Sequence, residues 1–219
     1  MVSRNAYAKS IKEIEHGILL MGGLVEQAVY NSVQALLKMD TAAASRVITG
    51  DDVIDQMYSE IEDKCIKLVA TQQPMAKDLR IIITGIKILV NLERMADYTV
   101  DIARITMELS GYPADVRPFE YIKKMAVFVQ KMVKDGLDAY VNGDIEKAGA
   151  MCRMDDEVDK LFSEAFKELI ERMQGDPNMV VQHAYSLFIG RYLERIADHA
   201  TNIGEEVIYI ATGERKELN

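Results

Sequence analysis

The sequence predicts an all-α protein built as two tandem three-helix bundles that are related by an internal pseudo-twofold repeat. Apolar residues recur at intervals of three or four along most of the chain, which is the spacing of an amphipathic helix. Only 4 of the 219 residues are proline, so long stretches lack the residue that most readily ends a helix. The second half of the chain also repeats the pattern of the first half.

Three helices are expected in the first half. One apolar stripe covers residues 7–37 and stops at Met39-Asp40. A second covers residues 47–68 and ends before Pro74, and a third runs from residue 79 to about residue 109. The short connections between these stripes favour antiparallel packing of neighbouring helices.

A segment with two prolines, residues 111–118, separates the halves. Because a proline disfavours helix at the preceding residue, we expect this segment to be a linker. Residues 1–110 are then the first three-helix repeat, and residues 119–219 are the second.

Two offsets align the halves. An offset of 104 residues places Asp51 on Asp155 and Asp55 on Asp159. An offset of 101 residues places the segment 93–102 on the segment 194–203, and the difference of three falls in the loops around Pro74 and Pro177. The repeat therefore places acidic residues on the second and third helices of both halves.

These acidic residues form four acid-x-x-x-acid motifs, followed one turn later on the third helices by Asp101 and Asn202. The motifs are Asp51 with Asp55, Glu93 with Asp97, Asp155 with Asp159, and Glu194 with Asp198. Residues four apart on a helix differ by only ~40° in direction and by ~6 Å along the axis. Each pair therefore projects its carboxylates from one face.

The third-helix pairs continue the apolar spacing, since Glu93 and Asp97 follow Ile86 and Val90 without a change of phase. We therefore expect them, and Glu194 and Asp198 likewise, at positions that core residues would occupy. Buried like charges repel and need a counter-charge, so either cations neutralise these groups or the faces stay open to water.

Two interpretations of the motifs remain open. In the simpler one they are solvated acidic faces, and Arg94 and Arg195 pair with the neighbouring carboxylates. In the other they bind metal, and an oxygen-only ligand set suits Mg, Mn, Fe or Ca, with bridging carboxylates able to hold more than one ion. The chain has only three histidines, and we expect His199 at the surface or behind a ligand instead of on a metal.

Composition excludes several classes of protein. The 35 acidic residues exceed the 26 basic ones and give a net charge of −9, which argues against nucleic-acid binding. The N-terminal sequence does not have the pattern of a signal peptide, and no window is apolar enough to predict a transmembrane helix. We therefore expect a cytoplasmic protein.

Several segments resemble the PhoU family. They are LERMAD (92–97) and LERIADH (193–199), GDDVID (50–55) and MDDEVD (154–159), MGGLVEQAV (21–29), and the connection with Gln73, Pro74, Asp78, Leu79 and Arg80. The resemblance extends over essentially the whole chain. PhoU proteins are cytoplasmic regulators associated with the Pst phosphate transporter.

The resemblance implies a set of functional residues and a function. Several PhoU proteins carry multinuclear iron, zinc, manganese or magnesium sites on their acidic motifs. The matching positions here are Asp51, Asp55, Glu93, Asp97, Asp101, Asp155, Asp159, Glu194, Asp198 and Asn202. Asn202 departs from its counterpart Asp101, so the two sites are not expected to be identical.

The implied role is negative regulation of phosphate uptake and of the phosphate-starvation response. It would operate through contacts with the transporter's ATPase subunit and with the phosphate-sensing histidine kinase, and the protein would reach the membrane only through these partners. A homodimer is also expected by analogy with the family.

Three alternatives stay open. The chain is compatible with a metal-free acidic adaptor and with a PhoU-like accessory of another phosphate carrier. A carboxylate-bridged di-iron oxidase or ferritin-like enzyme is the third, but it would need two Glu-x-x-His motifs, and the chain has a single one at residues 13–16. The sequence also lacks the common catalytic motifs, so we do not expect an enzyme.

Overall fold

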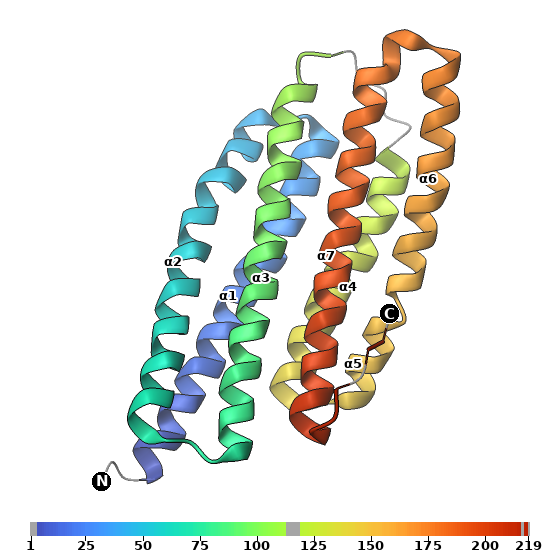
Figure 1. The fold of residues 1–219 in the computed structure, drawn as a ribbon. Coiled ribbons are helices and arrows are strands. Elements are labelled where there is room, and N and C mark those ends of the chain that lie inside the picture. The colour runs from blue at the N-terminus through green and yellow to red at the C-terminus, as the bar shows by residue number, and fades with distance from the viewer. Residues whose placement is uncertain (1–3, 113–118, 216, 219) are drawn as a thin grey trace.

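A computed structural model describes residues 4–112, 119–215 and 217–218 of the chain. Within these ranges the regular structure is entirely helical, which confirms the all-α prediction (Figure 1). The helices are α1 (Arg4–Lys38), α2 (Thr41–Gln72), α3 (Ala76–Leu109), α4 (Phe119–Asn142), α5 (Ile145–Cys152), α6 (Asp155–Gly175) and α7 (Val180–Thr212), with a short 3₁₀ turn, η1 (Pro177–Met179), before α7.

The expected linker, residues 111–118, is described only at its start. Gly111 and Tyr112 close the end of α3 by donating their backbone N–H groups to the carbonyls of Glu108 and Leu109. Residues 113–118 lie outside the described residues.

The repeat is visible in the turns that follow α1 and α4. Met39 and Gly143 both have positive φ, at 50° and 61°, the left-handed conformation that ends many helices. The next residues, Asp40 and Asp144, are the N-caps of α2 and α5, and each accepts a hydrogen bond of 2.9 Å from the backbone N–H three residues later. The two turns are therefore built in the same way.

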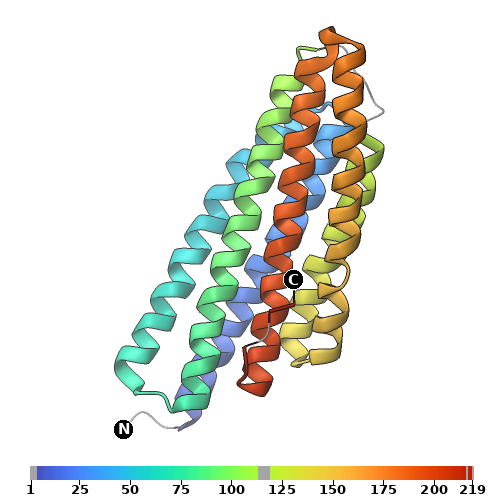
Figure 2. The same cartoon turned by 45° about the vertical axis from the view of Figure 1, so that its right-hand side comes forward.

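The halves meet along two helix pairs, α3 with α7 and α1 with α4. Helices α2 and α6 lie at the two outer edges (Figures 1 and 2). One hydrophobic cluster contains fully buried residues from both halves, among them Met21 of α1, Leu92 of α3, Met125 of α4 and Ile196 of α7. The two three-helix units therefore share a core.

The middle helix of the second half differs from the prediction. The repeat predicts one continuous helix like α2, but the structure divides it into α5 and α6 at Arg153 and Met154. Beside this break, α5 lies very close to α7 at Gly204, where an added Cβ atom would be 2.6 Å from Cys152 Sγ and 2.8 Å from Met151 Cε. The counterpart of Gly204 in the first half is Ala103, and α2 continues without interruption there.

A search for membrane-spanning helices within the described ranges finds none with both the length and the apolar character that crossing a bilayer requires.

Candidate functional site

The first carboxylate cluster consists of Asp51 and Asp55 on α2 and Glu93 and Asp97 on α3, two helices that pack against each other. The pKa of Asp51 is raised to about 6, first by burial and then by the nearby charges of Asp55, Asp97 and Glu93. The pKa of Glu93 is also raised, first by burial and then by Asp97. The fold thus brings together the two acidic motifs of the first half.

The second carboxylate cluster consists of Asp155 and Asp159 on α6 and Glu194 and Asp198 on α7. The pKa of Asp155 is raised to about 7, first by burial and then by the charges of Asp159, Asp198 and Glu194. This cluster is more enclosed than the first, because Asp155 is only 6% exposed and Glu194 only 9%.

Arginine side chains neutralise part of each cluster. Arg94 donates to Asp97 Oδ2 at 3.0 Å and lies 3.4 Å from Glu93 Oε2, and Arg195 donates to Asp198 Oδ2 at 2.8 Å. The predicted pairing of both arginines with neighbouring carboxylates is confirmed.

The second cluster has an additional cation that the sequence analysis missed. Arg191 pairs with Glu194 Oε1, whereas its counterpart at the 101-residue offset is the apolar Val90. An arginine three residues before Glu194 on the same helix was the available signal.

The expectation that the third-helix acids occupy core positions is correct for Glu194 and wrong for Glu93, Asp97 and Asp198, the last of which has a side chain that is 26% exposed. The side chains of Glu93 and Asp97 are 26% and 43% exposed. The buried face of α3 is formed by neighbours such as Leu92, Met95 and Ala96, because α3 packs against three other helices and buries a wide arc. The apolar spacing that includes Val90 lies at the edge of this arc, and Val90 itself is exposed.

Asp101 and Asn202, one turn beyond the clusters, have partners of their own. Asp101 accepts a hydrogen bond from Arg104 at 3.2 Å, and it helps to raise the pKa of Tyr192 on α7, although burial of that phenol is the larger cause. Asn202 donates to Asn91 Oδ1 on α3 at 3.1 Å, which links the two halves.

His199 also contacts Asn91, and its Nδ1 lies 2.8 Å from the amide oxygen. Burial lowers the pKa of His199, followed by the nearby charge of Arg195. Next to it, the ring of Tyr98 stacks on Tyr192 across the α3–α7 contact at a centroid distance of 5.7 Å. These residues lie at the contact between α3 and α7. The sequence analysis did not identify Asn91, Tyr98 or Tyr192 as candidates.

The cluster residues have the chemistry to hold a hard metal cation. Asp155 Oδ1 and Glu194 Oε2 are buried and lack a hydrogen-bond partner among the described residues. Buried carboxylate oxygens without partners are costly, and a cation would satisfy both. With the side chains in their present positions, no three His, Cys, Asp or Glu residues of the described part of the chain lie close enough together to coordinate one metal ion. Binding would therefore need side-chain rearrangement, including release of the arginines.

Comparisons with known proteins agree with this duplicated arrangement. The family model of the PhoU domain matches residues 18–106 and again residues 122–207. The chain is 40% identical over 222 residues to a phosphate-specific transport system accessory protein PhoU homolog from Clostridium acetobutylicum, with 100% of both chains covered. A homolog of the same description from Pseudomonas aeruginosa is 36% identical and covers 93% of this chain and 84% of its own.

Solved structures show the same fold. PhoU from Pseudomonas aeruginosa superposes with a TM-score of 0.93 at 35% identity and covers 95% of this chain and 100% of its own. The phosphate transport system regulatory protein PhoU from Streptococcus pneumoniae gives a TM-score of 0.87 at 30% identity, with 96% and 99% covered. The chain belongs to the PhoU family.

Proposed function

We propose that this protein is a cytoplasmic accessory protein of a phosphate-specific transport system and a negative regulator of phosphate uptake and of the phosphate-starvation response. The family membership supports the transport association, since relatives that match over nearly the whole of this chain carry that description. The observation that carries the regulatory part is the pair of carboxylate clusters, repeated at matching positions on α2 with α3 and on α6 with α7.

The clusters are proposed to hold metal ions, with iron, zinc, manganese and magnesium as candidates. Asp51, Asp55, Glu93 and Asp97 would hold metal in the first half, and Asp155, Asp159, Glu194 and Asp198 in the second. A bound cation would neutralise the enclosed acids of each cluster, Asp51 and Glu93 in the first and Asp155 and Glu194 in the second, whereas Asp55 and Asp159 are exposed. Asp101 and Asn202 are proposed as additional ligands, each of which would first have to leave its present partner.

Arginine residues link metal occupancy of the carboxylate clusters to the charge of the protein surface. Arg94, Arg191 and Arg195 now neutralise cluster carboxylates, and all three lie partly or fully exposed. If the carboxylates turn to a cation, the guanidinium groups are released to the surface, where they can meet acidic groups of a partner. We propose the transporter's ATPase subunit and the sensor histidine kinase as these partners, and a homodimer as the form that binds them.

Elemental analysis of protein purified without chelator or metal-affinity tag tests the metal sites. Asp51→Asn/Asp97→Asn should lose the metal of the first cluster, and Asp155→Asn/Asp198→Asn that of the second. The exposed neighbours offer a control, Asp52→Asn/Asp156→Asn, which changes charge by the same amount next to Asp51 on α2 and next to Asp155 on α6. Protein that stays metal-free after incubation with each candidate metal would leave the clusters as acidic docking faces.

Binding to the purified ATPase subunit and to the kinase's cytoplasmic part, measured with and without metal, tests the regulatory role. We expect both partners to bind and the cluster variants to bind more weakly than the control. A deletion strain should express phosphate-starvation genes in phosphate-rich medium. Normal repression in that strain would contradict the regulatory assignment.

A further inference from the structure

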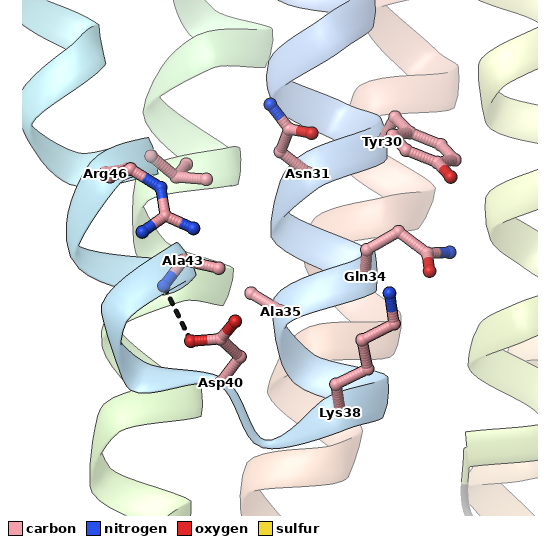
Figure 3. A pocket seen from close by; sticks show the side chains of 9 residues that line it. Tyr30, Asn31, Gln34, Ala35, Lys38, Asp40, Ala43 and Arg46 are labelled. Carbon is pink, nitrogen blue, oxygen red and sulfur yellow. Dashed lines mark hydrogen bonds between the residues drawn. The ribbon is translucent and has the colours of Figure 1, made fainter.

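A surface groove of about 390 Å³ lies where α1 ends and α2 begins (Figure 3). Polar side chains of α1 line it, namely Tyr30, Asn31, Gln34 and Lys38, and Arg46 extends into it from α2. Its floor consists of small apolar residues such as Ala35. Hydrogen-bond donors from two helices therefore surround one cavity, which shares no residue with the carboxylate clusters.

Among the residues that the structure describes, no side chain neutralises the two cations of the groove. Neither Lys38 nor Arg46 forms an ion pair with any residue that the structure describes, although the chain carries a net charge of −9 and many of its other basic residues are paired. Both are exposed.

The one acidic residue that lines the groove, Asp40, already accepts a hydrogen bond. Asp40 Oδ1 accepts the backbone N–H of Ala43 at 2.9 Å as the N-cap of α2. The lining thus has two positive groups and one negative group, and the negative group is already stabilised by the start of a helix.

The second half of the molecule supplies an internal comparison. At the 104-residue offset, Asn31 corresponds to Asp135 and Gln34 corresponds to Asp138. Lys147 pairs with both of these aspartates, at 3.8 Å and 3.2 Å. The same place in the repeat is therefore acidic and internally neutralised in the second half, whereas the first half has neutral amides and free cations.

The amides of the first half are also suited to donate. Asn31 Oδ1 accepts a hydrogen bond from Gln27 at 3.0 Å, which leaves its NH₂ group as the free end of the side chain. Arginine, lysine and amide NH₂ groups together are the donors that bind a tetrahedral oxyanion, since phosphate oxygens accept several hydrogen bonds from different directions.

We propose that this groove binds a phosphate group, held by Lys38 and Arg46 and oriented by Asn31 and Gln34. The group is either free inorganic phosphate or the phosphate of a small molecule such as a nucleotide. The site shares no residue with either cluster, and it is tested in metal-free protein so that its failure is distinguishable from failure of the proposed metal sites.

Titration of the full chain, ¹⁵N-labelled and kept in EDTA, tests the site. EDTA chelates any metal ion at the clusters, so that phosphate cannot bind there through a metal. Inorganic phosphate and ADP are added separately at constant ionic strength, and we expect saturable shifts at the Ala43 amide, the Asn31 side chain and the Arg46 Nε. Lys38→Gln/Arg46→Gln should weaken binding at least about tenfold, the loss of about one charge-assisted hydrogen bond.

Two further variants separate the site from general charge. Asn31→Asp/Gln34→Asp installs the acids of the second half and should abolish binding although both cations remain. Lys12→Gln/Lys77→Gln removes two exposed lysines at the other end of the first half and should leave binding unchanged.

Each outcome is decisive. Saturation by inorganic phosphate supports the site with the free ion as ligand, and saturation by ADP alone supports it with a nucleotide as the source of the phosphate. No saturable shift with either up to about 10 mM, or equal weakening in the Lys12→Gln/Lys77→Gln control, would overturn the proposal.

Discussion

At Asp155, loss of hydration opposes ionisation more than the neighbouring negative charges do. The side chain is almost fully buried at the first turn of α6, and one of its oxygens lacks a partner among the described residues. A carboxyl in such a place is most stable when it is protonated or when it contacts a cation.

This environment predicts how stability depends on pH in metal-free protein. The pKa of Asp155 is about 7 in the folded chain and near its ordinary value of 3.8 in the unfolded chain. Between these values the folded state binds more protons, so the free energy of unfolding falls as pH rises from about 4 to about 7. Asp155→Asn should reduce this slope and increase stability at pH 8 by about 2 kcal/mol.

Urea unfolding in EDTA at several pH values measures this effect. Glu157→Gln, at an exposed position of the same helix, is the control and should keep the wild-type slope, because Glu157 is not among the charges that shift the pKa of Asp155. An Asp155→Asn variant that is less stable than wild type at pH 8 would show that the carboxylate makes a favourable contact in the metal-free protein.

The left-handed turn at Gly143 predicts a second effect at the residue scale. Gly143 has φ of 61°, and no atom would lie within 4 Å of an added Cβ, so Gly143→Ala should be destabilised by backbone strain alone, by about 1 kcal/mol. Gly23→Ala adds a methyl group in equally open space inside α1 and should be neutral or stabilising. Thermal unfolding of the two variants separates strain from packing, and equal midpoints would contradict this explanation.

The eight cluster residues could be predicted from the sequence because helical spacing and the repeat place them on facing helices. Their partners across the molecule could not. The contact of Asn91 with Asn202 joins residues that are 111 positions apart, and no spacing rule connects them. The same holds for the stacking of Tyr98 on Tyr192, which depends on how α3 and α7 pack.

At the scale of elements, the break between α5 and α6 depends on the neighbouring helix. Residues 152–155 contain no glycine or proline, so local sequence gave no reason to divide the helix. Next to the break, Cys152 packs closely against α7 at Gly204, so the break coincides with a tight contact between helices. By contrast, the prediction of the turn at Met39-Asp40 is confirmed, because Asp40 is a favourable N-cap.

Gly204→Ala tests this packing. The added methyl group would overlap Cys152 Sγ and Met151 Cε, so we expect destabilisation of about 1 to 3 kcal/mol. Gly50→Ala is the matched control, since an added Cβ there meets no atom within 4 Å and the position lies inside α2. Guanidinium unfolding gives both values, and a neutral Gly204→Ala would mean that α5 can shift away from α7 at no cost.

At the scale of the whole molecule, the shared core predicts that the two halves unfold together. Met21 and Met125 occupy equivalent positions on α1 and α4, and both are fully buried in the same cluster. Met21→Ala and Met125→Ala should each lower the midpoint of one common transition. Each should reduce the free energy of unfolding by about 2 to 5 kcal/mol. Calorimetry that resolves two transitions, with only one of them shifted by each variant, would show that the halves are independent.

The packing of α3 on α7 and of α1 on α4 has the symmetry of an isologous dimer, but both sides belong to one polypeptide. In a dimer of identical chains, any side chain on one side must also appear on the other. Covalent linkage removes that restriction, so Asp101 can stand where the other half has Asn202, and Asn31 can stand where the other half has Asp135. Two copies of a single half would present either two cationic grooves or none, whereas the duplicated chain can keep one.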